Sequence, residues 1–307
     1  MNSRETRKKR KKSLKRFFKR TLFRLYGSRL ISDKVAVKSQ FKLSLKRKLD
    51  LKNPKTFNEK LNWMKLYYRK PLLTTMVDKY EVKKCVSDLI GEEYVVPLIG
   101  AFNKWNEIDF TKLKAPFVLK TTNSSGVVFV VRDIEKFDFK TAKKRINKSL
   151  RTNYSYSCRE WPYKNIKPRI IVEECLKDNK EENLPVYKFF CFDGEPFIVQ
   201  TIKNDKTSYE TIDYFDMDWN LLKLKQNFEN SERPLDKPNN FEQMKELAAK
   251  LSKGQPFVRV DLYSVNGRVY FSEFTFFSDA GYERFYPDKW DLILGEKINL
   301  EKYGKII

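Results

Sequence analysis

Hydrophobic and polar residues alternate most regularly in 257–275, which reads FVRVDLYSVNGRVYFSEFT. In its first half, aliphatic side chains fall on one side, and Arg259 and Asp261 fall on the other. A period of two residues is typical of a strand with one buried face. Asn266-Gly267 then supplies the turn residues that join two such strands. The segment therefore predicts a β-hairpin.

The length of the loop in this hairpin decides which charged residues share a face. A two-residue Asn-Gly loop would place Asp261 opposite Ser272 and leave Glu273 on the other face. A three-residue loop with Gly267 in a left-handed bulge would shift the register by one residue, so that Arg259, Asp261 and Glu273 share a face. Two carboxylates on one hairpin suit a Mg²⁺ ion that carries phosphates. Taken alone, the pattern fits acids that meet water better than it fits a metal site, and a metal site requires the three-residue loop.

Two helices are predicted between residues 56 and 91. Residues 56–59 (Thr-Phe-Asn-Glu) form a capping box that opens the first helix, and Pro71 ends it. The second helix follows Asp78 and stops at Gly91. The other predicted elements are a short strand at 95–98, a basic helix at 141–150, strands at 169–176, 187–192, 196–202 and 211–215, and an amphipathic helix at 241–251.

A further pair of strands is predicted within 116–133, on either side of a loop of small hydroxylic residues with one glycine, 121–126. Lys120 closes the first of these strands. Backbone N–H groups of such a loop can wrap a polyphosphate. An ordinary hairpin turn explains the same residues. The loop is therefore evidence for a phosphate site only when other segments of the chain point to the same ligand.

The chain of 307 residues carries a net charge of +23, which favours an anionic partner. Residues 1–24 hold 12 Lys and Arg residues and one Glu. Apolar residues recur there at helical spacing, namely Leu14, Phe17, Phe18, Leu22 and Leu25. A basic helix with such a stripe is typical of an anionic membrane surface, so we expect residues 4–25 to lie there. A disordered or nucleic-acid-binding arm is the alternative, but no nucleic-acid motif is present, and nucleic acid is the less favoured partner.

Histidine is absent from the sequence, which excludes His-based catalytic triads and His metal sites. Any chemistry must use carboxylates, lysines, arginines, hydroxyls or a bound metal. The four cysteines lie far apart without a C-x-x-C pair, and no apolar signal peptide is recognised. We therefore expect reduced, mostly buried thiols in a cytoplasmic protein.

Five separated blocks occur in one order along the chain: LKNPKTFNEKLNWMKLYYRKPLLTTMVDKYEVKK (51–84), FVLKTTNSSG (117–126), REWPYKNIKPRIIVEECL (159–176), YKFFCFDGEP (187–196) and PFVRVDLYSVNGRVYFSEFTF (256–276). Together they resemble the teichuronopeptide-biosynthesis (TupA-like) ATP-grasp family. The resemblance implies an α+β ATP-grasp fold, in which two α+β subdomains clasp a nucleotide behind the basic helical arm. The implied division is an arm at 1–27, an N-terminal helical region at 28–115, subdomain A at 116–168, and subdomain B with the tail at 169–307.

The same resemblance implies that ATP is bound by several segments. Lys79 and Lys120 would be the two phosphate lysines, and point cations suit a triphosphate that water no longer solvates. The other implied nucleotide residues are a loop over the phosphates (Ser124, Ser125 and Gly126) and a strand end that meets adenine (Glu173, Glu174, Cys175 and Leu176). The loop keeps only one glycine where the family tends to have more, and added Cβ atoms restrict close approach to phosphates.

The resemblance also implies Mg²⁺ as a cofactor beside ATP. Asp261 and Glu273 would hold the ion. Thr275 stands where the family often places Asn, and its hydroxyl is a weaker ligand. Arg259, with Lys120, would serve as a catalytic residue that steadies the transferred phosphoryl group.

The implied activity is an ATP-dependent carboxylate–amine ligase with an acylphosphate intermediate. It would join an amino or amino-acid group to a sugar carboxylate in bacterial cell-surface polysaccharide biosynthesis. The implied partners are a sugar carboxylate or polysaccharide, an amine donor, and the inner face of the cell membrane. One alternative is a glycosyltransferase, because Asp216-Met217-Asp218 resembles a metal-binding D-x-D pattern, although the residues after it are typical of a turn. The other is a degenerate ATP-grasp scaffold without turnover.

Overall fold

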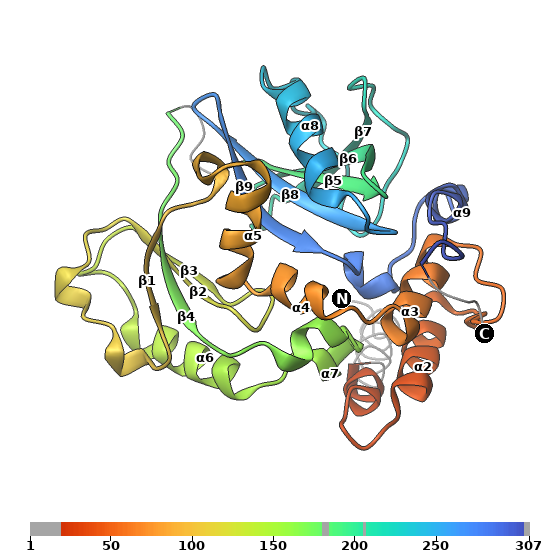
Figure 1. Ribbon diagram of the computed structural model, residues 1–307, viewed down its shortest axis with the longest axis horizontal. Helices are drawn as coiled ribbons and strands as arrows, with labels where there is room; N and C mark the ends of the chain where they lie inside the picture. Colours follow the sequence, from red (N-terminus) through yellow and green to blue (C-terminus); the bar gives the residue numbers. More distant parts are fainter. Residues whose placement is uncertain (1–19, 180–183, 205–206, 304–307) are drawn as a thin grey trace, which may run out of the picture.

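Two antiparallel sheets form the framework of the protein (Figure 1). The computed structural model describes residues 20–179, 184–204 and 207–303. The smaller sheet has the strand order β1-β4-β2-β3, and the larger has the order β7-β6-β5-β8-β9. The strands are β1 (Leu98–Phe102), β2 (Phe117–Thr121), β3 (Val128–Val131), β4 (Ile170–Glu174), β5 (Val186–Phe192), β6 (Glu195–Lys203), β7 (Thr211–Asp216), β8 (Val258–Val265) and β9 (Arg268–Thr275).

Helices surround these sheets, and their presence beside antiparallel strands confirms the predicted α+β class (Figure 1). Of the helices given below, α2 to α5 precede β1 and lie in the N-terminal region that was predicted to be helical. The helices are α2 (Asp33–Leu45), α3 (Phe57–Tyr67), α4 (Pro71–Val77), α5 (Glu81–Ile90), α6 (Phe139–Arg151), α7 (Ser155–Cys158), α8 (Phe241–Ser252) and α9 (Lys289–Glu296).

The larger sheet shares one hydrophobic core with helices from the N-terminal part of the chain. Phe57 of α3 packs edge-to-face against Phe257, with ring centroids 4.8 Å apart. On the same sheet, Phe241 of α8 stacks on Phe189 of β5. Removing such large apolar side chains from water is the main stabilising term in folding. The smaller sheet has a separate core under α6.

The smaller sheet takes strands from both sides of the boundaries expected at 115/116 and 168/169. Its edge strand β1 comes from the region before 116, and β4 comes from the region after 168. β1 begins at Leu98, where the strand expected at 95–98 was to end. The two sheets are therefore defined by which strands pair in space and not by the order of the strands along the chain.

The local signals at helix ends act as predicted. Thr56 caps α3, because its side chain accepts the Glu59 N–H while the Glu59 side chain accepts the Thr56 N–H. α5 ends at Gly91, whose φ of 117° favours glycine. Pro71 differs from the prediction: α3 has already ended at Tyr67, and Pro71 begins α4, because proline fits the first turn of a helix.

The hairpin of β8 and β9 has the two-residue loop of the two alternatives, so the expectation that facing acids require a three-residue loop is wrong. Val265 pairs with Arg268, and only Asn266 and Gly267 lie between them. Their φ values of 50° and 81° are both left-handed, as in a type I′ turn. Asn and Gly tolerate this region best, and the turn matches the twist of the flanking strands.

A β-bulge at Ser272 nevertheless sets the two acids opposite each other. Asp261 pairs with Glu273, whereas Leu262 pairs with Phe271, so that Ser272 is the additional residue on β9. One extra residue shifts the register by one. The expected pairing of Asp261 with Glu273 is therefore present, but a bulge in the strand produces it rather than the loop.

The basic arm lies mostly outside the described residues. Its last part, 20–26, is helical. Phe23 packs edge-to-face against Tyr282, with ring centroids 5.8 Å apart, whereas Leu22 and Leu25 are exposed. This end of the arm thus has one face docked on the protein and an apolar face open to its surroundings.

The four cysteines are free thiols, as predicted. Only Cys191 is fully buried, so the prediction that most of them are buried is wrong. Across the part of the chain that the structure describes, no helix combines the length and the apolar character needed to cross a membrane.

Candidate active site

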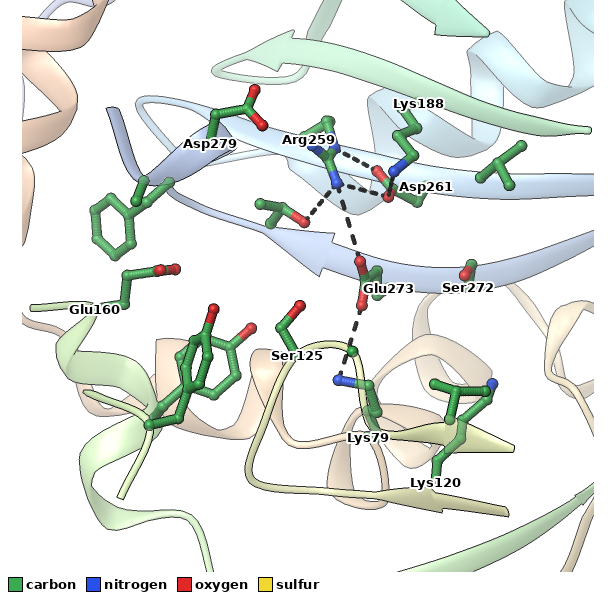
Figure 2. A pocket seen from close by; sticks show the side chains of 18 of the residues that line it. Lys79, Lys120, Ser125, Glu160, Lys188, Arg259, Asp261, Ser272, Glu273 and Asp279 are labelled. Atoms are coloured by element: carbon green, nitrogen blue, oxygen red, sulfur yellow. Dashed lines mark hydrogen bonds and ion pairs between the residues drawn. The ribbon is translucent and has the colours of Figure 1, made fainter. Parts of the chain in front are cut away.

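A cavity of about 420 Å³ lies between the two sheets (Figure 2). β2, β3 and the loop between them form one side, and β5, β8 and β9 form the other. Residues on either side of α7 and the turn 278–281 close one end. The predicted site residues on its wall are Lys79, Lys120, Ser125, Gly126, Arg259, Asp261, Glu273 and Thr275.

Asp261 and Glu273 reach this cavity from directly opposed positions on β8 and β9. Asp261 is almost fully buried, whereas the Glu273 side chain is 35% exposed. Burial disfavours the charged form of Glu273, but nearby cations, led by Lys79 and Lys188, outweigh it and hold its pKa below the ordinary value. Glu273 is therefore charged in a site that cations surround.

Arg259 is fixed at the centre of this group. Its Nε and Nη2 donate to the two oxygens of Asp261, at 2.7 and 2.8 Å. Nη2 also donates to Thr275 Oγ1 at 3.0 Å, and Nη1 donates to Ser278 Oγ at 3.3 Å. Burial opposes the charge of the guanidinium, but Asp261 raises the pKa of Arg259 above its ordinary value. The planar guanidinium group, paired in this way with a carboxylate, is held rigidly beside the cavity.

Lys79 connects the acids to the loop of small residues on the opposite wall. Its Nζ donates to the Ser124 carbonyl at 3.0 Å and lies 3.8 Å from Glu273 Oε2 (Figure 2). The side chain projects from the segment between α4 and α5. A single ammonium group therefore spans the gap between the two walls.

The loop between β2 and β3 presents Ser125 and Gly126 to the cavity. Ser124 is buried, and its Oγ lies 2.8 Å from Thr121 Oγ1 and 2.9 Å from Ser149 Oγ. Gly126 has a φ of 81°, and a Cβ there would meet nothing within 4 Å. The left-handed backbone, and not crowding, is thus the reason for glycine. Ser124 anchors the loop, and Ser125 and Gly126 form its inner surface.

Glu173, which was predicted to meet adenine, lies between two lysines. Its Oε1 is 2.5 Å from Lys83 Nζ on α5, and its Oε2 is 2.6 Å from Lys120 Nζ on β2. Burial disfavours the Glu173 carboxylate, but Lys120 and Lys83 outweigh it and lower its pKa. Burial also opposes the charge of Lys120, but Glu173 raises the pKa of Lys120 above the ordinary value. Glu173 therefore keeps Lys120 charged and in place on the cavity wall.

The other predicted adenine residues, Glu174, Cys175 and Leu176, do not form part of this wall. Glu174 and Cys175 line a different hollow, beside Ile99 and Pro116. Successive residues of a strand point to opposite faces, so Glu173 and Glu174 cannot both face the same cavity.

The sequence model of the TupA-like ATP-grasp family matches residues 59–299. This range includes every residue on the cavity wall. The chain belongs to the TupA-like ATP-grasp family. The match also confirms the predicted ATP-grasp fold. Among curated proteins, no match to this chain is found.

Solved structures resemble this TupA-like protein in part. The D-alanine–D-alanine ligase from Helicobacter pylori is 18% identical, with a TM-score of 0.43 over 79% of this chain and 69% of that one. The Bacillus anthracis D-alanine–D-alanine ligase complexed with ATP is 19% identical, with a TM-score of 0.37 over 66% and 55%. N5-carboxyaminoimidazole ribonucleotide synthetase from Thermus thermophilus is 11% identical, with a TM-score of 0.40 over 68% and 48%. This chain therefore spans about half the length of the last two.

Lys188 is a cation of the TupA-like site that the sequence interpretation missed. It lies on β5 opposite Asp261, and its Nζ is 3.5 Å from Asp261 Oδ2 (Figure 2). It is also the one charged residue in the strand VYKFFCF, 186–192. A lone lysine in an otherwise apolar strand was the available signal.

Sequence reasoning also missed the other end of the cavity in this TupA-like protein. Two acids reach it, Glu160 from the segment after α7 and Asp279 from the turn 278–281 (Figure 2). The aromatic residues on this part of the wall are Tyr154, Tyr163 and Phe277. The aromatic character of 154–168 was the only signal, and nothing in its spacing linked it to the hairpin.

The Asp216-x-Asp218 pattern forms a turn and lies off the cavity wall. The Asp216 carboxylate accepts the Asp218 N–H at 2.9 Å and the Asn220 N–H at 2.8 Å. It also accepts Asn220 Nδ2–H at 2.9 Å. Its oxygens are thus used to hold the chain reversal after β7, as the sequence after the pattern suggested.

The facing carboxylates of the TupA-like site fit a Mg²⁺ ion. Over the described ranges of the chain, the ion-pair contacts of Glu273 are long, at 3.8 Å to Lys79 and 3.9 Å to Arg259. Each Asp261 oxygen keeps acceptor capacity beside its bond to Arg259. No group of three or more His, Cys, Asp or Glu side chains suited to a metal occurs among the described residues. Mg²⁺ commonly uses one or two carboxylates and takes its other ligands from phosphates and water, which matches this pair.

Proposed function

We propose that this protein is an ATP-dependent carboxylate–amine ligase. The observation that carries the proposal is the charge pattern of the cavity. Four cations, Lys79, Lys120, Lys188 and Arg259, surround the paired acids Asp261 and Glu273. An excess of fixed cations around two carboxylates suits a triphosphate with its metal ion, and membership of the ATP-grasp family supports the same ligand.

The chain's own residues would act mainly by binding and orienting the reactants. Ser125 and Gly126 would cover the phosphates with backbone N–H groups, and Lys120 of β2 would neutralise them from the same wall. Arg259, held by Asp261, would stabilise the charge of the transferred phosphoryl group. Asp261 and Glu273, with the Thr275 hydroxyl, would hold Mg²⁺, and the ion would supply positive charge that neutralises the phosphates.

The reaction has two steps. A carboxylate oxygen of the first substrate attacks the γ-phosphorus of ATP, and the bond between this phosphorus and the bridging oxygen of the β-phosphate breaks. The products are ADP and an acylphosphate. A neutral amine then attacks the acyl carbon, the bond to phosphate breaks, and the proton that the nitrogen loses leaves with phosphate. Neither step needs a histidine, since positioning and fixed charges lower both barriers.

We further propose that the first substrate is a sugar carboxylate or polysaccharide and that the work is done at the inner face of the cell membrane. The basic arm supports a location at an anionic surface. Adenine binding near Glu174, Cys175 and Leu176 remains a prediction from the resemblance.

Substitution of the two acids tests the proposed function. Glu273→Gln and Asp261→Asn should reduce Mg²⁺-dependent ADP release by about a hundredfold or more, because the phosphates lose their fixed metal ion. The measurements are Mg·ATP affinity by calorimetry and ADP release by purified protein with a panel of uronic acids and amino acids. Circular dichroism should report an unchanged fold.

Asp218→Asn provides the matched control, because Asp218 is an exposed acid outside the cavity. It should keep full ATP binding and ADP release. Full activity in both cavity variants would overturn the metal assignment. Loss of nucleotide-sugar hydrolysis in the Asp218 variant would favour the glycosyltransferase alternative, and ATP binding without turnover on any substrate would favour a scaffold.

A further inference from the structure

The charges on the cavity wall are divided between its two ends (Figure 2). Lys79, Lys120 and Lys188 lie toward one end, where the phosphates are proposed to bind. Glu160 and Asp279 lie toward the other. A second anion such as the sugar carboxylate would be repelled from the acidic end, so that end suits a ligand of opposite charge.

Glu160 is the unusual member of this end. The residue is only 8% exposed, yet it lines the cavity, and Figure 2 shows its carboxylate extending into the open space. Within residues 20–179, 184–204 and 207–303, its oxygens accept no hydrogen bond and lie in no ion pair. A buried carboxylate without a partner costs several kcal/mol unless a ligand satisfies it.

The charged groups near Glu160 do not supply the partner that its carboxylate lacks. Burial raises the pKa of Glu160, the buried Lys65 opposes that rise, and Asp279 and Glu273 add to it. Lys65 is already engaged, because its Nζ donates to the Ala280 carbonyl at 2.6 Å and lies 4.0 Å from the centre of the Tyr282 ring. It therefore holds the turn 278–281 in place and does not approach Glu160 within ion-pair distance.

The surroundings of Glu160 suit an organic cation better than a metal ion. Aromatic side chains form the neighbouring wall, and the rings of Tyr154 and Tyr163 are 5.0 Å apart. Aromatic faces attract ammonium groups and also accommodate the alkyl part of an amine. Asp279, an exposed residue with a left-handed φ of 48°, also lines the cavity.

We propose that Glu160, assisted by Asp279, forms the subsite that binds the ammonium group of the amine donor. This inference rests on the proposed ligase function and specifies one of its substrates as a primary amine that carries a positive charge in solution. The donor would then enter at the acidic end and meet the activated carboxylate between the two ends.

A pair of neutral and charged probes tests the subsite directly. Alanine methyl ester carries an ammonium group, and methyl lactate has a hydroxyl in its place. We expect the full-length protein, with Mg²⁺ and a non-hydrolysable ATP analogue, to bind the ammonium probe about tenfold more tightly, as measured by ligand-observed NMR. Glu160→Gln should abolish this preference and leave the affinity for the ATP analogue unchanged.

Glu246→Gln, which changes an exposed acid on α8 outside this cavity, is the control and should keep the preference. If Glu160→Gln fails to fold, Asp279→Asn tests the same end from an exposed position and should reduce the preference about threefold. Equal binding of the two probes by the wild type overturns the proposed subsite. A preference that survives in Glu160→Gln also overturns it. Where Glu160→Gln does not fold, a preference that survives in Asp279→Asn overturns it. A further outcome is a protein that binds no ATP while its preference for the ammonium probe still depends on Glu160. That result overturns the ligase function and the role in binding the amine donor, but it keeps the ammonium site.

Discussion

Two lysine ammonium groups contact the buried carboxylate of Glu173, one from α5 and one from β2. Only Lys120 of the two lines the cavity, and Lys83 also donates to the Val96 carbonyl at 2.6 Å. The residue thus fixes a cavity lysine without itself reaching the cavity. Removing one member of such a buried group leaves the others charged and unpaired, which is costly.

Glu173→Gln should reduce the free energy of unfolding at pH 7 by about 3–5 kcal/mol. The pKa of Glu173 is lower in the folded than in the unfolded chain, so its stabilisation is complete above its ordinary pKa and is lost as the pH falls through the folded value. Denaturant unfolding followed from pH 7 to pH 3 should therefore depend less on pH in the variant than in the wild type.

Glu174→Gln changes the next residue of the same strand, which is exposed. Its effect on the free energy of unfolding should stay within about 0.5 kcal/mol at every pH. Equal losses in the two variants would contradict the role assigned to Glu173.

At the scale of the element, the turn of the β8–β9 hairpin also fastens the segment that follows β4. Asn266 Nδ2 donates to the Lys177 carbonyl at 2.9 Å, and Asn266 Oδ1 accepts the Asn179 N–H at 3.1 Å. The Asn266 N–H donates to Asp178 Oδ2 at 2.7 Å. One turn residue therefore links the larger sheet to the connection between the two sheets.

Asn266→Gly should keep the turn but release this connection, because glycine accepts the left-handed backbone and lacks the amide side chain. We expect faster hydrogen exchange at the Asn179 amide with little change in the unfolding midpoint. Gly267→Ala is the matched variant, since it strains the turn by about 1 kcal/mol and keeps the side chain of Asn266. Unchanged exchange at Asn179 in Asn266→Gly would contradict the link.

At the scale of the molecule, the cavity depends on the meeting of segments that are distant in the chain. The N-terminal helices pack on the larger sheet and supply Lys79, while the smaller sheet supplies Lys120 and the loop of small residues. The basic arm joins this body through Phe23, which leaves Leu22 and Leu25 exposed beside basic residues. These two residues belong to the stripe that was predicted to meet the membrane.

The double variant Leu22→Glu/Leu25→Glu should weaken binding of the full chain to anionic phospholipid vesicles by at least tenfold, because it places charge on the apolar face. Vesicle co-sedimentation at several salt concentrations is the measurement, and binding should fall as salt rises. Leu30→Glu, at a fully exposed position outside the stripe, is the control and should bind as the wild type does. Equal binding of all three proteins would remove the membrane role.

The sequence by itself determined the features that rest on neighbouring residues. The capping box at Thr56, the stop at Gly91 and the turn at Asn266-Gly267 are local, because each depends on φ preferences or on hydrogen bonds within a few positions. The family resemblance also located most of the cavity wall, since its blocks carry the charged residues themselves.

Only the tertiary structure decided which of these residues meet. The bulge at Ser272, and not the loop, sets Asp261 opposite Glu273, because packing of both strand faces selects the register. Pairing of β4 inside the smaller sheet turned Glu173 toward Lys120. Glu160 and Asp279 come together only because separate segments close the same end of the cavity, a long-range packing event that no local pattern encodes.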